Sequence, residues 1–197
     1  MAKIKLNSVF EEKDYMEHGN QYAFYKMAFM SAHVPLYYRN IIREAKHSVY
    51  IWDPYFNVSQ EDDDTRIFAH QSQALKWRFL MNKAKRDDFM KSAAIWETHI
   101  NHQVPNTHKS GTSIEFRNFY DSEVWSFHDR FLIVDADTDE CQVYLVGSSV
   151  SYHLRSQNAT GICRLDDEDD KKLVKDMFEL YWKNAKKYGD LYNVTLS

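Results

Sequence analysis

The chain has 197 residues, of which 44% are hydrophobic and 15% aromatic, and its formal net charge is -4. This length and apolar content predict one packed domain of ordinary size and argue against a disordered chain. No apolar run approaches the roughly 20 residues of a membrane helix, and the first residues lack the order of a signal peptide. We therefore expect a cytoplasmic protein without stable membrane association.

The first 33 residues are expected to form an N-terminal extension, and residues 34–197 the domain. The aromatic-rich residues 11–31 are interpreted as a helix. Its aromatic and methionine side chains are too many for one narrow helical face. The segment therefore either packs on a partner subunit as well as on its own core, or simply caps the domain.

Helical and strand-like segments alternate along the rest of the chain, which predicts an α/β class with a mixed central sheet flanked by helices. The stretch SVYIWDPYF (48–56) is apolar on both alternating faces, as in a central strand covered on both sides, until Asp53-Pro54 ends it. Further strands are predicted at 75–81, 113–119, 131–134, 143–146 and 160–165, and helices at 34–46 and 86–100.

The last helix is the clearest element, because its apolar residues recur at helical spacing and its charges run from acidic to basic, as the helix dipole prefers. One stripe of this helix is formed by Leu173, Val174, Met177, Phe178, Tyr181, Trp182 and Ala185. The two cysteines, Cys141 and Cys163, are too few for a disulfide framework and are interpreted as buried free thiols.

The candidate chemistry lies in WSFHDRFLIVDADTDECQVYLVGSSV (125–150), where His128, Arg130 and Asp135 form H-x-R-x4-D. In a strand, residues 128 and 130 point to the same face. An Arg fork suits a phosphate group, and a histidine can attack it or move a proton. Ser148 and Ser149 follow Gly147 and could add hydroxyl donors. The alternative is that His128 is an ordinary structural histidine.

This order of residues resembles the phospholipase D superfamily, whose signature is H-x-K-x4-D followed by G-S-x-N. The helix and strand at 41–56 and the strand and closing helix at 156–185 are also similar to that family, so the resemblance covers residues 34–187. A single motif copy is found in the short bacterial endonucleases of the superfamily, which build one active site from two identical subunits. The resemblance therefore implies a homodimer and a nucleic-acid substrate, DNA or RNA.

The resemblance also implies a mechanism without a metal or other cofactor. His128 attacks phosphorus, His128 of the partner subunit protonates the leaving oxygen, and Arg130 from both subunits holds the phosphate oxygens. Asp135 and Ser148 complete the motif, with Asp135 expected to be a buried structural partner. Ser149, Gln157 and Trp125 are the expected substrate-binding residues.

Three positions depart from the family pattern. Arg130 replaces the family Lys, Val150 replaces the Asn of G-S-x-N, and Gln157 replaces a Glu that would orient the nucleophilic histidine. The H-D-R variant is similar to the phospholipase D-like C-terminal domain of MIT-domain proteins, a binding module. The alternative function is thus an inactive phosphate- or nucleic-acid-binding or dimerisation module in a larger assembly, for which defence against phage is the setting suggested by analogy.

Three weaker patterns each have a plain structural interpretation. The group His99, His102 and His108 lacks a full ligand set and is interpreted as a polar loop, not a metal site. Basic residues at 76–86, interleaved with Trp77 and Phe79, either contact a nucleic-acid backbone or form a solvated edge strand and helix start. Aromatic side chains near strand ends either stack on a base or belong to the core; they are Trp52, Tyr55 and Trp125.

Overall fold

The structure is a computed structural model. It describes residues 15–17, 20–26, 41–54, 56, 73–82, 110–119, 128–147, 159–188 and 191–195. None of the helices in these ranges is long and apolar enough to cross a membrane.

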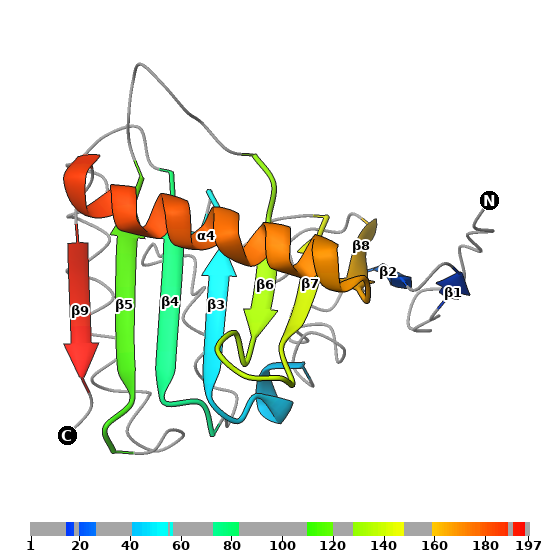
Figure 1. Cartoon of the computed structure of the whole chain (residues 1–197), viewed down its shortest axis with the longest axis horizontal. Helices are drawn as coiled ribbons and strands as arrows, with labels where there is room; N and C mark the ends of the chain where they lie inside the picture. Colours follow the sequence, from blue (N-terminus) through cyan, green and yellow to red (C-terminus); the bar gives the residue numbers. More distant parts are fainter. Residues whose placement is uncertain are drawn as a thin grey trace.

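In the described part of the chain, nine strands form one sheet in the order β1-β2-β8-β7-β6-β3-β4-β5-β9 (Figure 1). The strands are β1 Tyr15–Glu17, β2 Asn20–Lys26, β3 Ser48–Trp52, β4 Lys76–Met81, β5 Ser113–Asn118, β6 Phe131–Val134, β7 Gln142–Val146, β8 Ala159–Leu165 and β9 Leu191–Thr195. The neighbours β3, β4 and β5 are parallel, and the other neighbouring pairs are antiparallel. The predicted mixed α/β fold is confirmed.

The centre of the sheet is covered on both faces, as predicted from the apolar residues at 48–52. Tyr50 and Trp52 of β3 pack in the cluster formed with the C-terminal helix, and Val49 and Ile51 point to the other face by strand alternation. All four are at most 4% exposed. Such a strand fits only at an interior position of a sheet.

The helix α4, Glu168–Tyr188, crosses one face of the sheet (Figure 1). It begins after Asp167, whose side chain accepts hydrogen bonds from the backbone N–H groups of Asp169 and Asp170 at 2.9 and 3.1 Å, as an N-cap residue does. Phe178 and Trp182 stack on each other at 5.6 Å and are buried against the sheet. The predicted stripe is therefore confirmed along most of its length, although Leu173 is 62% exposed.

The predicted helix over residues 11–31 is wrong, because the described residues there form β1 and β2. β2 pairs with β8 over six register positions, from Gln21 opposite Arg164 to Lys26 opposite Ala159. Aromatic residues such as Tyr22 favour strands, and the excess of aromatic side chains for one helical face was the signal for this. The division between residues 1–33 and 34–197 stays a prediction.

Other elements differ in detail from the sequence interpretation. β9 was not predicted, and it pairs with the edge of β5 from Leu191 to Thr195. Residues 41–44 are helical, within the predicted helix 34–46. The predicted helix 86–100 lies outside the described residues.

Basic side chains of β4 and β5 lie against aromatic rings beneath α4. The Arg78 guanidinium carbon lies 4.9 Å from the ring centroids of both Tyr50 and Trp182, and that of Arg117 lies 4.1 Å from the Trp182 ring. Arg78 also pairs with Glu179 of α4 at 2.7 Å. These cation–aromatic contacts join the helix to the sheet.

This packing corrects, for the described residues of β4, the interpretation of residues 76–86 as a solvated edge strand and helix start. β4 lies between β3 and β5, and Trp77 and Phe79 are fully buried. Lys76 and Arg78 are engaged with aromatic rings and carboxylates on the α4 face. The rest of the predicted basic cluster lies outside the described residues.

Asp137 connects the turn between β6 and β7 to the sheet. Its carboxylate accepts hydrogen bonds from the Tyr50 hydroxyl at 3.0 Å and from Lys76 Nζ at 3.1 Å. Partial burial alone would raise the pKa of Asp137, but the hydrogen bonds from Lys76 and Tyr50 outweigh it and lower this pKa below its ordinary value of 3.8. The ionised carboxylate is thus favoured in the folded protein.

We expect Asp137→Asn to lower the free energy of unfolding by about 0.5 kcal/mol near neutral pH, because exposed ion pairs contribute little. Since the folded pKa is depressed, this contribution is complete above the ordinary pKa and is lost as the pH falls through the lower folded pKa. Urea unfolding of both proteins at neutral and acidic pH measures it. A difference between the two proteins that grows on acidification would contradict this assignment.

Both cysteines are free and half-buried, not fully buried as predicted. Burial raises the pKa of the Cys141 thiol, with nearby Lys175 acting in the opposite direction. A thiol with a raised pKa is mostly protonated at neutral pH and is a poor nucleophile. Cys141 is therefore not a candidate for the chemistry.

Candidate active site

The motif histidine and arginine lie at the end of the sheet that is formed by the carboxyl ends of β3, β4 and β5 and the start of β6. His128 and Arg130 immediately precede β6. The last residue of β3, Trp52, pairs with the first residue of β6, Phe131. This register places Arg130 beside the residue that follows β3, which is Asp53.

Arg130 is not part of a strand, so the expectation that strand alternation turns it and His128 to one face does not apply. Its carbonyl oxygen accepts a hydrogen bond from the backbone N–H of Val146 at 2.9 Å, which fixes the entry to β6 against the end of β7. The His128 residue is exposed, whereas the Arg130 side chain is 23% exposed. The histidine is thus open to a ligand, and the arginine two residues further along the chain is partly enclosed.

Asp53 is the buried partner of Arg130. Asp53 Oδ1 lies 3.7 Å from Arg130 Nε, and the Asp53 side chain is only 2% exposed. The backbone of Asp53 is held on both sides, since its N–H donates to the carbonyl of Leu80 at 3.0 Å and its carbonyl accepts from the N–H of Phe56 at 3.2 Å. A buried carboxylate in this position attracts the guanidinium and offsets part of its charge.

Sequence reasoning did not single out Asp53 as a site residue. The signal was present, because Asp53 directly follows a strand whose residues 49–52 are all apolar or aromatic. A charged residue at the carboxyl end of a buried parallel strand lies where open α/β sheets bind their ligands.

Tyr181 of α4 lies close enough to this end of the strands for nearby charges to shift the pKa of its phenol. Burial raises the pKa of Tyr181, and the negative charge of Asp129 raises it further. The phenol therefore stays protonated across the physiological range and keeps its donor proton.

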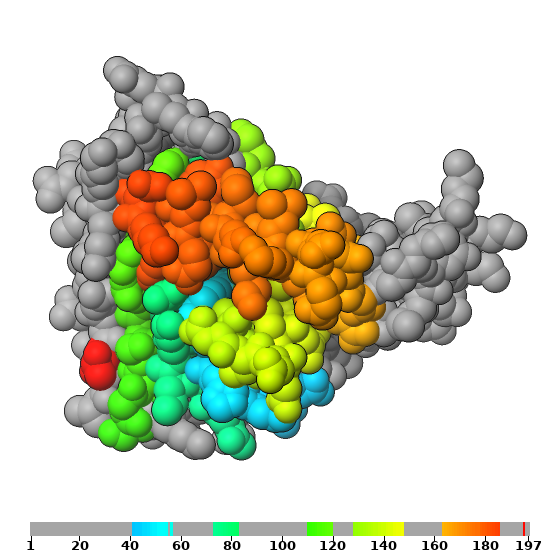
Figure 2. Space-filling model, viewed as in Figure 1, coloured from blue at the N-terminus to red at the C-terminus, as the bar shows by residue number. Residues whose placement is uncertain are grey.

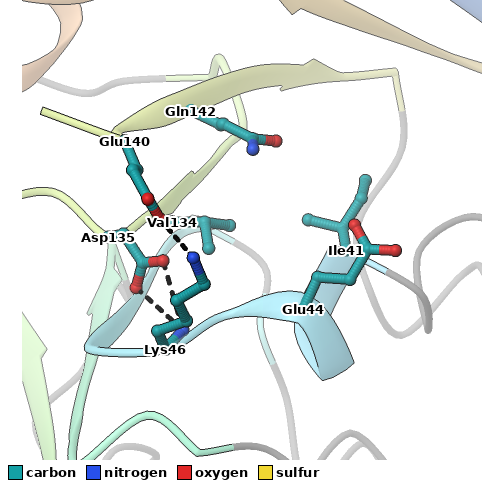
Figure 3. Close-up of a pocket in the computed structure, with 7 residues that line it drawn as sticks. All are labelled: Ile41, Glu44, Lys46, Val134, Asp135, Glu140 and Gln142. Atoms are coloured by element: carbon teal, nitrogen blue, oxygen red, sulfur yellow. Dashed lines mark hydrogen bonds and ion pairs between the residues drawn. The ribbon is translucent and has the colours of Figure 1, made fainter.

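The structure does not bring Asp135 together with His128. Asp135 follows the last residue of β6, at the opposite end of the strand, and is 4% exposed. Its carboxylate accepts hydrogen bonds from the backbone N–H groups of Lys46, His47 and Ser48 at 3.1, 2.7 and 3.0 Å. Figure 3 shows the contact with Lys46. Asp135 thus fixes the start of β3 to the end of β6.

The backbone of Asp135 has a φ of 53°, in the left-handed region that Asp tolerates better than most residues. A pocket of about 290 Å³ opens beside it, lined by Lys46 and Glu140 among others (Figure 3). Lys46 Nζ and Glu140 pair across it at 2.6 Å. This pocket lies at the opposite end of β6 from His128, so it is not part of the candidate site.

The remaining predicted site residues, Trp125, Ser148, Ser149 and Gln157, lie outside the described residues, as do Tyr55 and the group His99, His102 and His108. Trp52 is described and belongs to the core, where its ring packs against Phe131 and Tyr181. Within the described ranges no three His, Cys, Asp or Glu side chains are arranged to hold a metal ion.

No protein-family model and no curated protein matches the sequence. Among solved structures, the chain is similar to Nuc from Salmonella typhimurium, a phospholipase D family member, with a TM-score of 0.51 and 14% identity, covering 88% of this chain and 97% of that chain. It is also similar to NucT from Helicobacter pylori, with a TM-score of 0.52 and 12% identity, covering 83% of this chain and 96% of that chain. The chain therefore has a phospholipase D-like α/β fold.

Proposed function

We propose that this chain is a phosphodiesterase of phospholipase D type that cleaves nucleic acid without a metal ion. The observation that carries the proposal is the exposed His128, two residues before Arg130, whose Nε lies 3.7 Å from the buried carboxylate of Asp53 at the end of the sheet where β3, β4 and β5 end. The fold shared with Nuc supports the same chemistry. A histidine and a guanidinium at one place supply a nucleophile and the charge that stabilises a phosphoryl transition state.

In the proposed reaction, a ring nitrogen of His128 attacks phosphorus. The nitrogen–phosphorus bond forms as the bond to the leaving oxygen breaks, and His128 of the partner subunit gives its proton to that oxygen. Water then attacks the phosphohistidine, returns a proton to the partner's His128 and releases His128 with a phosphate monoester. Arg130 from each subunit neutralises charge on the oxygens that do not leave.

The other motif residues have supporting roles in this proposal. The hydroxyls of Ser148 and Ser149 donate to the phosphate, Gln157 orients the histidine, and Trp125 stacks on a base. Asp135 acts as a positioning residue, since it fixes the strand that follows His128 to the start of β3.

A second candidate function is a phosphate- or nucleic-acid-binding module with no turnover. The ion pair between Arg130 and Asp53 favours it, because a guanidinium already beside a buried carboxylate offers less charge to a phosphate. The replacement of a family Lys by Arg130 points the same way. The two functions differ in whether His128 is needed for a chemical step.

The test is a cleavage assay in EDTA at one salt concentration, on single- and double-stranded DNA, RNA and a chromogenic phosphodiester. Wild type, His128→Ala and His47→Ala are compared, since His47 is an exposed histidine at the opposite end of β3. We expect His128→Ala to lose cleavage by at least ~10³-fold and His47→Ala to retain it, as removal of a nucleophile demands.

Denaturation at alkaline pH during turnover should also trap an acid-labile phosphoenzyme in wild type that is missing in His128→Ala. Equal activity of the two variants would overturn the role of His128. Folded wild-type protein that cleaves none of the substrates but binds oligonucleotide would favour the binding module.

A further inference from the structure

The outer face of α4 carries two large apolar side chains in solvent. Leu173 is 62% exposed and Leu180 is 50% exposed. They are seven residues apart, so they lie about two helical turns and ~10 Å apart on the same side of the helix. Figure 2 shows α4 as a ridge across this face of the molecule, uncovered along its length.

The charges beside these leucines are divided between the two ends of the helix. Asp169 is exposed one turn before Leu173, and Lys183 is exposed one turn after Leu180. Between the leucines, Asp176 is exposed and forms an ion pair with Lys172 of the preceding turn. These six side chains form an outer stripe of the helix, which is distinct from the buried apolar stripe and is acidic at its start and basic at its end. They are Asp169, Lys172, Leu173, Asp176, Leu180 and Lys183.

We propose that this stripe of α4 is a self-association surface that pairs with α4 of a second copy of the chain, antiparallel and about a two-fold axis near Asp176. In a two-fold contact, a residue i of one copy lies against a residue j of the other copy, and residue j of the first copy lies against residue i of the second. Leu173 of one copy then lies against Leu180 of the partner subunit, and Asp169 lies near Lys183 of the partner subunit. The helix is thus complementary to itself in both apolar and charged positions.

The antiparallel direction follows from the charges. A parallel pair would set Asp169 against the same residue of the second copy and Lys183 likewise, which is repulsive at both ends. In the antiparallel pair, only the two Asp176 side chains meet at the axis. Each of these is already paired with Lys172 of its own helix, which reduces their repulsion.

This surface is separate from the site of the proposed function. The residues of α4 that face the sheet are Phe178, Tyr181, Trp182 and Ala185, and they are buried in the core. The stripe points away from the sheet, whereas His128 lies at the end of the strands. Two leucines on each copy make a contact well below the ~800 Å² per partner of a standard interface, so association is expected to be weak and dependent on concentration and salt.

Sedimentation velocity over a wide concentration range tests the leucines. We expect the double variant Leu173→Gln and Leu180→Gln to lose one association step of wild type, from tetramer to dimer or from dimer to monomer. Leu75→Gln is the matched control, since Leu75 is 46% exposed and lies outside α4. An unchanged association in the α4 double variant, or a wild type that stays monomeric at the highest concentration, would overturn the proposal.

A charge exchange tests the antiparallel direction. Asp169→Lys alone and Lys183→Glu alone are each expected to weaken self-association at least about fivefold, because both ends of the contact become repulsive. A mixture of the two variants should regain association, since the stripe of one variant is then basic at both ends and meets a stripe that is acidic at both ends. Failure of the mixture to regain it would contradict the antiparallel arrangement.

The cleavage assay keeps this result distinct from the proposed function. The α4 variants are expected to retain EDTA-resistant cleavage per folded molecule, because the exposed side chains of the stripe point away from the sheet, whereas His128 directly precedes the β6 segment of that sheet. Loss of association with retained cleavage supports the α4 surface. Loss of both together would mean that α4 forms the subunit contact of the cleavage site, and would overturn a separate surface.

Discussion

Asp135→Asn is expected to lower the free energy of unfolding by about 2 kcal/mol, and Asp135→Ala by about 3–4 kcal/mol. The reason is that one buried carboxylate accepts three backbone hydrogen bonds, from Lys46, His47 and Ser48. Asparagine keeps one acceptor oxygen but turns its NH₂ group toward the same donors. Alanine leaves all three N–H groups without this acceptor.

The backbone adds to the difference between these variants. Asp135 has a φ of 53°, which asparagine adopts readily and alanine does not. A second residue with a compatible backbone, Asp135→Gly, should therefore be more stable than Asp135→Ala by about 1 kcal/mol. Urea unfolding measures all three variants, with the exposed turn residue Asp139→Asn as the control.

The same variants separate a structural role of Asp135 from a catalytic one. If Asp135 acts only by fixing β6 to β3, then Asp135→Asn retains cleavage per folded molecule at low temperature. An Asp135→Asn protein as stable as the Asp139→Asn control would contradict the structural role. Cleavage lost from a fully folded Asp135→Asn protein would show a direct part in the reaction.

The sequence predicted the central sheet because buried strands leave a strong apolar pattern. The strand 131–134 was predicted with its observed bounds, and the strand 143–146 differs only by the addition of Gln142. In such short segments every side chain is apolar and polar turns mark both ends. The pattern therefore determines the strand almost without help from its neighbours.

The edges of the sheet could not be predicted in the same way. β1 and β9 are the two edge strands, where one neighbour is missing, and β2 lies next to β1; polar residues such as Asn20 and Asn193 are tolerated in these outer strands. Their sequences have no clear alternation, and the aromatic residues of β2 fit a helix as well as a strand. Pairing with β8 and β5, which is a long-range contact, decides their conformation.

The candidate site was predicted in part for a related reason. A motif names His128 and Arg130, but the contact of Arg130 with Asp53 depends on the register of β3 and β6, which lie far apart in the sequence. The predicted strand 131–134 already placed Asp135 at its far end from His128, but the hydrogen bonds of Asp135 to the start of β3 depend on the pairing of β3 with β6. Leu173 fits the apolar stripe of α4 by spacing, yet it lies at the border of the stripe and faces solvent.

Arg130→Met is expected to lower the free energy of unfolding by about 3 kcal/mol, because it removes a cation from beside a carboxylate that is 2% exposed. Asp53→Asn in the same chain should regain most of this loss, since the buried negative charge is then gone as well. The coupling energy from the four proteins of this cycle is expected to be at least about 1 kcal/mol. Strict additivity of the two single variants would contradict the ion pair.

Cleavage and binding by the same proteins bear directly on the function. Under the proposed phosphodiesterase, Arg130→Lys retains part of the cleavage because charge is kept, whereas Arg130→Met loses at least ~10²-fold. Asp53→Asn frees the guanidinium from its anchor, so we expect tighter oligonucleotide binding together with slower turnover, since the charge is stronger but less well placed. Tighter binding with unchanged turnover would show that Asp53 only offsets charge, and that the position of Arg130 is set by the backbone at the start of β6.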